Sequence, residues 1–341
     1  MPRVLGIDPG TISLDLCGLD DGRVFFDRSI PTSEALADAA LVPALIDSLG
    51  PLDLVAGPSG YGLPLVGAYD LSENDIRLAC LAAPGEAGGI GGLAALMRAL
   101  ARAIAPLVFT PAAIHLPSVP EHRKINRVDI GTADKVCTAA LAIHEEALRQ
   151  DCSVAGVSCI LVEAGGAFTA ALAVDHGRIV DGLGGTSGPI GMRGAGALDG
   201  EVAFLADHVS KAMLFHGGVE DLRDTAAGWT AYVEGVQKAI ATLRVSVPHA
   251  TTVVLAGRHA PALRENLNSG PDRSGPARIL AGFGCTAKHA AQGAALLAEG
   301  LAGGLSRGLV ETMGIRDASG TVLDHLQIID RESAARRIGL T

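Results

Sequence analysis

The residues best suited to chemistry near the start of the sequence are Asp8 and the small residues that come after it. Residues 3–7 form an apolar run, and Asp8-Pro9-Gly10-Thr11 comes next as a tight turn. Such a turn lets backbone N–H groups approach phosphate oxygens, Thr11 or Ser13 can add a hydroxyl donor, and Asp8 can hold a hydrated Mg²⁺ facing those phosphates. An ordinary Asp-Pro-Gly hairpin would have the same sequence, so the motif alone leaves both interpretations open.

The pattern around Asp8 occurs a second time around Glu163. In both places an apolar strand is followed by a carboxylate, a glycine turn, a return strand, an Asp-x-Gly-Arg turn and a third strand, over residues 4–26 and 157–182. In the second copy the turn contains Gly165 and Gly166. A repeat of this kind indicates an internal structural duplication. It favours two opposed phosphate-binding turns over a single ordinary hairpin.

Strands that alternate with helices fill the rest of the chain. Strands are expected at 52–56, 107–109, 113–116, 252–256 and 278–280, and helices at 34–49, 133–149, 199–206, 219–223, 230–243, 260–267 and 287–301. This order is typical of an α/β protein. Two glycine-rich stretches stand out: residues 84–92 could be a lid or a surface loop, and residues 184–200 are long enough to wrap a ligand. The turn at 282–286 leads into a helix N-terminus that suits phosphates or adenosine.

Composition limits the classes of partner. With 27 Lys+Arg against 37 Asp+Glu, the net charge of −10 argues against nucleic acid or an anionic membrane as the main partner. The 341 residues suggest two domains, and the 48% hydrophobic content allows a large core. The six cysteines contain no C-x-x-C pair, there is no signal-peptide pattern, and no apolar run is long enough for a transmembrane helix. We therefore expect a reduced, cytoplasmic protein.

These motifs together resemble the acetate and sugar kinase/Hsp70/actin superfamily. Residues 6–19 resemble its first phosphate motif, 160–172 its second, and 253–258 its adenosine motif. The resemblance implies two duplicated ribonuclease H-like (actin-like ATPase) domains, each a mixed five-stranded sheet with flanking helices, around an interdomain nucleotide cleft. Domain I would span 1–128 plus a C-terminal segment of about 305–341. Domain II would span 129–304.

Within the superfamily the chain is similar to the acetate/butyrate kinase branch and to an uncharacterised, butyrate-kinase-like family, DUF1464. Residues 127–136 resemble the acetate kinase segment R-x-x-G-x-H-G-T-S-H, and residues 185–199 resemble the glycine-rich stretch D-T-S-M-G-x-T-P-L-E-G-x-x-M-G-T-R-x-G-D of those kinases. The chain departs from the pattern at both histidines, which are Ile130 and Asp134, and at Glu163, where many members have Asp. The adenosine signature is reduced to Ala256-Gly257-Arg258.

The resemblance implies an ATP-dependent phosphotransferase that moves the γ-phosphate of Mg-ATP to a small acceptor, a short carboxylate or an alcohol. Asp8 and Glu163 would hold Mg²⁺ through water. The expected remaining catalytic groups are a cation over the γ-phosphate, from Arg127, Lys135 or Arg193, and a general base for an alcohol, from Asp129 or Asp134. Nucleotide-binding positions would be Gly10, Thr11, Ser13, Gly165, Gly166, Gly185, Thr186, Ser187, Gly257, Arg258 and Gly284.

Two other hypotheses remain beside the kinase. The protein could hydrolyse ATP as a conformational switch or activator without a small-molecule acceptor, or it could be a non-catalytic module that kept the fold. The apolar helices between residues 287 and 309 could form a homodimer contact or belong to the core.

Overall fold

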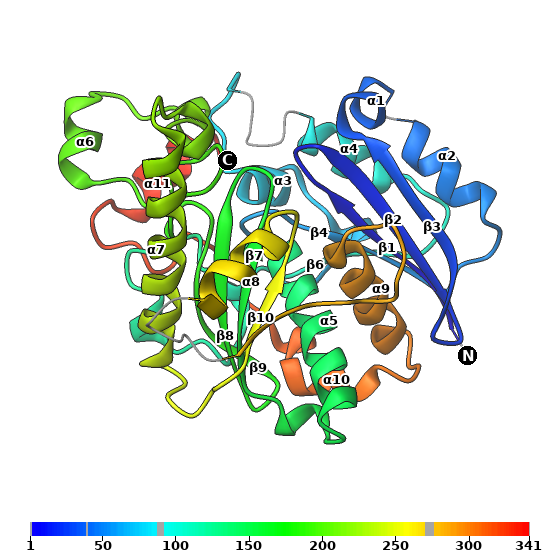
Figure 1. The fold of residues 1–341 in the computed structure, drawn as a ribbon. Helices are drawn as coiled ribbons and strands as arrows, with labels where there is room; N and C mark the ends of the chain where they lie inside the picture. The colour runs from blue at the N-terminus through cyan, green and yellow to red at the C-terminus, as the bar shows by residue number, and fades with distance from the viewer. Residues whose placement is uncertain (1, 39, 87–91, 270–275, 341) are drawn as a thin grey trace.

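The computed structural model describes residues 2–38, 40–86, 92–269 and 276–340. In this part of the chain, two mixed β-sheets are joined and covered by helices (Figure 1). The first sheet has the strand order β3-β2-β1-β4-β6-β5, and the second has the order β11-β10-β7-β8-β9. The glycine-rich stretch 84–92 lies mostly outside the described residues.

The first sheet begins with the predicted antiparallel meander. Strands β1 (Arg3–Pro9), β2 (Ser13–Asp20) and β3 (Arg23–Pro31) are consecutive neighbours. Strand β4 (Leu54–Pro58) runs parallel to β1, and β6 (Leu107–Thr110) runs parallel to β4. A two-residue strand, β5 (Val66–Gly67), adds a sixth, antiparallel edge to the sheet for which five strands were expected.

The second sheet repeats this arrangement. Strands β7 (Cys159–Ala164), β8 (Thr169–Asp175) and β9 (Arg178–Leu183) form the meander. Strand β10 (Val253–Ala256) is parallel to β7, as β4 is to β1, and β11 (Ala277–Ile279) is parallel to β10. Each meander also has a register shift near the end of its middle strand, at Gly18/Leu19 and at Ala173/Val174. A bulge at the same place in both copies supports the predicted duplication.

Helices α5 (Ala133–Arg149) and α9 (His289–Leu301) connect the sheets. Helix α9 packs on β1, β2 and β4 and against α5, which in turn contacts β7 and β8. Their packing is close because a Cβ added at Gly293 of α9 would lie 1.8 Å from the carbonyl oxygen of Cys137 in α5. Similarly, a Cβ at Gly6 of β1 would lie 2.1 Å from the Ala291 carbonyl. One core cluster joins the first sheet, both helices and the facing side of the second sheet.

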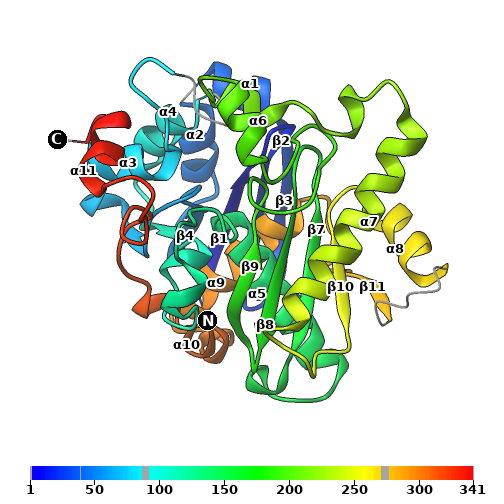
Figure 2. The same ribbon diagram turned by 90° about the vertical axis from the view of Figure 1, so that its left-hand side faces the viewer.

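The remaining helices form outer layers. The other face of the second sheet packs on α7 and α8 in a second core cluster (Figure 2). Near the first sheet, α11 lies beside α3, and the Arg77 guanidinium of α3 donates to the Ile338 carbonyl (3.3 Å) (Figure 2). The bounds are α1 Thr32–Ala37, α2 Leu41–Ser48, α3 Glu73–Cys80, α4 Leu93–Leu100, α6 Gly200–Leu205, α7 Thr225–Arg244, α8 Ala260–Ser269, α10 Arg307–Met313 and α11 Arg331–Arg337.

The predicted fold class is confirmed, with local differences. The single helix expected at 34–49 is two helices, α1 and α2, separated by the extended backbone of Asp38. The strand expected at 113–116 and the helix at 219–223 are both short 3₁₀ turns. Among the described residues, no helix is both long and apolar enough to cross a membrane. The domain division at 128/129 stays a prediction.

Candidate active site

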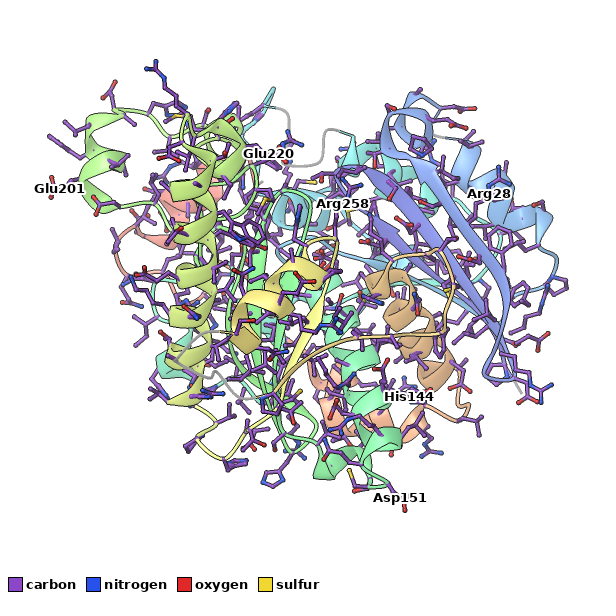
Figure 3. The ribbon with its side chains drawn as sticks, in the orientation of Figure 1. Arg28, His144, Asp151, Glu201, Glu220 and Arg258 are labelled. Carbon is purple, nitrogen blue, oxygen red and sulfur yellow. The ribbon has the colours of Figure 1, made fainter. Side chains whose placement is uncertain are left out.

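One cavity of about 510 Å³ lies between the two glycine turns. We call residues 9–13, between β1 and β2, the first turn, and residues 164–168, between β7 and β8, the second turn. Both turns line the cavity, and so does Arg258 at the carboxyl end of β10 (Figure 3). The sequence-predicted residues that the cavity brings together are Asp8, Gly10, Thr11, Ser13, Asp129, Asp134, Glu163, Gly165, Gly166, Gly185, Thr186, Gly257 and Arg258.

On the first-sheet side, Asp8 ends β1 opposite Asp15 of β2 and is only 5% exposed. The ammonium of Lys288, directly before α9, lies 3.4 Å from Asp8 Oδ2 and 3.0 Å from Asp15 Oδ2. It also donates to the Ser13 carbonyl (2.7 Å). Burial raises the pKa of Asp8 to about 6 despite the opposing effect of Lys288. The first turn therefore carries a buried carboxylate that ionises only near neutral pH.

On the second-sheet side, Glu163 of β7 faces the first turn of helix α5. The Lys135 ammonium lies 3.2 Å from Glu163 Oε2 and 2.5 Å from Asp134 Oδ2. Burial raises the pKa of Glu163 to about 7, with Lys135 opposing it. Burial acts the same way on Asp134, but Lys135 and a hydrogen bond from Thr132 outweigh it and lower the pKa of that carboxyl. The pKa of Lys135 itself is raised, because its two carboxylate neighbours overcome its burial.

The cavity carries an excess of negative charge. Without the histidines, its lining includes five carboxylates and three cations, so the net charge is −2 when all of them are ionised. The carboxylates are Asp8, Asp15, Asp129, Asp134 and Glu163, and the cations are Lys135, Arg258 and Lys288. Glu163 Oε2 is buried and makes no hydrogen bond, although the Lys135 ammonium lies 3.2 Å away. Carboxylate oxygens are the ligands that Mg²⁺ prefers. Charge balance, donor type and the unmet hydrogen-bonding capacity of this oxygen all fit a divalent cation near Asp8 and Glu163.

Asp129 organises the glycine-rich loop rather than facing a substrate with a free oxygen. Its Oδ2 accepts from the backbone N–H and the hydroxyl of Thr186, both at 2.9 Å, and its Oδ1 accepts from the Gly131 N–H at 3.3 Å. A Cβ at Gly184 would lie 1.8 Å from that Oδ1. The loop therefore lies directly on Asp129, and this close contact requires glycine at position 184.

The sequence matches the family described as "Protein of unknown function (DUF1464)" over residues 6–328. The chain belongs to the DUF1464 family. No curated protein matches it. The predicted resemblance to this family is thus confirmed.

The fold of this DUF1464 protein is similar to the folds of solved acetate and propionate kinases. Acetate kinase from Entamoeba histolytica matches with a TM-score of 0.57 and 11% identity, over 81% of this chain and 95% of that one. A propionate kinase from Francisella tularensis matches with a TM-score of 0.56 and 12% identity, over 86% and 98%. The acetate kinase of Porphyromonas gingivalis matches with a TM-score of 0.54 and 13% identity, over 80% and 88%. At these identities the likeness concerns the fold.

Four predicted site residues of the DUF1464 protein do not line the cavity: Arg127, Ser187, Arg193 and Gly284. The Arg127 guanidinium donates to the Gly182 carbonyl (2.6 Å) and lies 3.8 Å from Asp181, so it holds strand β9. Arg193 has an exposed side chain. Ser187 donates its hydroxyl to the Asp129 carbonyl. Of the three cations considered for the γ-phosphate, Lys135 lines the cavity, whereas Arg127 and Arg193 lie outside its lining. A catalytic role for either arginine stays a prediction.

Lys288 is the main site residue that sequence reasoning missed. A signal was present, because Lys288 follows the glycine turn at 282–284 and directly precedes α9. Its position is fixed by Asp27 of β3, which accepts from the N–H groups of Thr286 and Ala287, both at 2.7 Å. The cavity lining also includes apolar and aromatic side chains that single motifs did not indicate, namely Tyr61, Leu93, Phe168 and Phe215.

Proposed function

We propose that this protein is a Mg-ATP-dependent phosphotransferase that transfers the γ-phosphate to a small acceptor, a short carboxylate. One observation carries the proposal: two duplicated glycine turns face a single cavity, and the strand before each turn contributes a carboxylate, Asp8 or Glu163, with a lysine at 3.4 or 3.2 Å. Phosphoryl transfer requires positioning and charge neutralisation more than covalent chemistry by the protein. The cavity volume of about 510 Å³ lies within the range of small-molecule sites.

The nucleotide would bind with its phosphates between the two turns. The N–H groups of Gly10 and Gly165 close the two turns by donating to the Ser13 and Phe168 carbonyls (2.9 and 3.1 Å), and Lys135 and Lys288 supply positive charge to the phosphates. The adenosine would lie toward Gly257 and Arg258 and the turn before α9, which line the same cavity. Both lysines remain charged at neutral pH, since the neighbouring carboxylates raise the pKa of each ammonium against the effect of burial.

Asp8 and Glu163 would hold the Mg²⁺, through its water ligands. When bound, the ion neutralises negative charge on the phosphates during transfer. In its absence the two carboxyls hold protons more tightly than usual, as their raised pKa values indicate. Metal and proton therefore compete for the same two groups, and nucleotide binding should strengthen as the pH rises through about 6 to 7.

The acceptor would lie against the apolar and aromatic side chains of the cavity lining. Tyr61, Leu93, Phe168 and Phe215 suit the hydrocarbon part of a short carboxylic acid, while Lys135 can orient its carboxylate. A carboxylate oxygen attacks the γ-phosphorus and forms a new P–O bond, as the bond to the β–γ bridging oxygen breaks and ADP leaves with that electron pair. The acceptor is already ionised, so no general base is needed. In this proposal Lys135 takes the place of the first histidine of the acetate kinase segment. The residue at that position here is Ile130, which is fully buried in the core.

The test is ADP release from Mg-ATP with and without a panel of short carboxylates and small alcohols. We expect release that depends on a carboxylate, and its loss in Asp8→Asn. Asp20→Asn is the matched control, because Asp20 ends the same strand pair and is exposed at the opposite end from the cavity. Release independent of every acceptor would favour an ATP-driven switch. Absence of nucleotide binding by calorimetry would overturn both functions.

A further inference from the structure

A second cluster of ligating side chains lies at the far end of the second sheet. Asp175 ends β8, His176 is in the β8–β9 turn, and His249 is in the loop between α7 and β10. Strand β7 runs from Cys159, the partner of Val174, toward Glu163 and the cavity. The cluster is therefore at the opposite end of the strands from the candidate active site, near the lower ends of β8 and β9 in Figure 1.

The three side chains can direct one atom each at a common point. Those atoms, two imidazole nitrogens and one carboxylate oxygen, all lie within 4.8 Å of one another. His249 Nε2 is 2.8 Å from Asp175 Oδ1, and His176 Nε2 is 3.8 Å from the same oxygen. Ligands of a tetrahedral zinc at bond lengths of about 2.05 Å are about 3.3 Å apart, so the observed separations lie on either side of the required value.

The hydrogen bond at Nδ1 of His176 favours a metal-binding site over a simple ion pair. Its Nδ1 lies 3.3 Å from the Ala155 carbonyl, which can only accept, so Nδ1 donates there and Nε2, the nitrogen on the side of Asp175, is the one that a metal would take. Such a hydrogen bond from the outer ring nitrogen is the usual support of a metal-bound histidine. A simple ion pair between His249 and Asp175 would not require the second imidazole, that of His176, to be oriented toward the same carboxylate.

The backbone around His176 is held in an uncommon conformation. His176 has φ of +49°, in the left-handed region, where a non-glycine residue is strained. Its N–H donates to the Ser158 hydroxyl (3.1 Å), and that hydroxyl also lies 3.1 Å from Asp175 Oδ1 and 3.4 Å from His249 Nε2. Ser158 thus supports the turn and places a further oxygen beside the ligating atoms.

We propose that Asp175, His176 and His249 form a binding site for a divalent transition metal of the zinc type. Two imidazoles and one carboxylate suit zinc, cobalt or nickel, whereas Mg²⁺ prefers oxygen ligands alone. The ligands come from the β8–β9 turn and from the loop before β10, so the bound metal cross-links two segments more than 70 residues apart. The site is independent of the proposed nucleotide chemistry.

The experiment measures metal binding to the full chain by equilibrium dialysis with Zn²⁺ and by visible absorption with Co²⁺. We expect one tightly bound equivalent, d–d bands typical of four- or five-coordinate cobalt, and thermal stabilisation by Zn²⁺ relative to EDTA. His249→Ala should weaken binding at least about tenfold, since loss even of an outer hydrogen bond costs that much. His176→Asn should also weaken it, and asparagine tolerates positive φ.

His216→Ala is the matched control. His216 is also an exposed histidine beside a carboxylate, with its Nδ1 3.6 Å from Asp221, but it belongs to no three-ligand cluster among the described residues. Binding lost in the His249 and His176 variants and kept in the control supports the site. Binding that is absent in the natural sequence, or equal in all four proteins, overturns it. Circular dichroism in EDTA separates a lost ligand from a lost fold.

Discussion

Replacing Glu163 by glutamine tests the electrostatics of the candidate active site most directly. The carboxyl pKa rises from its usual 4.5 to about 7, mainly through burial. Each unit corresponds to 1.36 kcal/mol, so the ionised Glu163 costs the unliganded fold about 3 kcal/mol. The glutamine side chain would keep the shape and remove the charge, and Lys135 would retain Asp134 as its partner at 2.5 Å.

The sign of the effect follows from the raised pKa. Below about pH 4 the Glu163 carboxyl is protonated in both the folded and the unfolded chain, so it does not change the free energy of unfolding. As the pH rises from about 4.5 to 7, the unfolded chain releases the proton first, and the fold loses stability. We expect Glu163→Gln to be more stable than the natural protein by about 1 kcal/mol at pH 5 and by about 3 kcal/mol at pH 8. With an unfolding entropy of about 2.1 cal/mol/K per residue, the difference at pH 8 is about 4 °C in Tm.

The assay is thermal unfolding at pH 5 and pH 8, with and without Mg-ATP. Without ligand, the variant should unfold at the higher temperature at pH 8; with Mg-ATP, the natural protein should gain stability and the variant should gain far less. Glu201→Gln, a change of the same chemistry on the exposed helix α6, should alter neither result (Figure 3). A variant that is less stable at pH 8 and still responds fully to Mg-ATP would refute the reasoning. Glu163 would then be a structural partner of Lys135 and no metal ligand.

Three further substitutions test the residues that position the groups of the candidate active site. Lys288→Met leaves two buried carboxylates without their cation, so urea unfolding should show a loss of about 3 kcal/mol at pH 8 and less at pH 5, below the raised pKa of Asp8. Gly6→Ala brings a Cβ within 2.1 Å of the α9 backbone and should lower the free energy of unfolding by at least about 3 kcal/mol, whereas Gly57→Ala meets no atom within 4 Å and should have a small effect. Thr186→Val removes one hydrogen bond to Asp129 and should cost about 1–2 kcal/mol, measured by the same unfolding titration, with weaker nucleotide binding.

The duplication is what made the fold predictable from sequence. Alternation of apolar residues identified each meander, and the repeated order of carboxylate, glycine turn and Asp-x-Gly-Arg turn related residues 4–26 to 157–182. Both meanders are present with matching bulges. The short strand β5 was missed because its two residues carry no periodicity. A strand was predicted at His115 because the residue alternates with apolar neighbours over four residues. A 3₁₀ turn with a buried histidine has the same sequence pattern.

The cations of the site could not be ranked from sequence in the same way. Arg127, Lys135 and Arg193 all lie near family-like motifs, but which side chain enters the cavity depends on the packing of its element. Arg127 is long enough to reach β9 and binds the carbonyl of Gly182 there. Lys135 is in the first turn of α5, whose N-terminus faces the cavity. Only the assembled sheets distinguish these two positions.

The two lysines extend the duplication beyond the strands that revealed it. Lys288 directly precedes α9, and Lys135 is in the first turn of α5, so each sheet's carboxylate is matched by a lysine at a helix N-terminus. A helix N-terminus already favours negative charge, and the added ammonium strengthens that preference for phosphate oxygens. The two helices also pack backbone against backbone at Gly293. The separation of the two cations is therefore set by the close helix contact in the core, which makes that contact part of the proposed phosphate site although it lies outside the cavity.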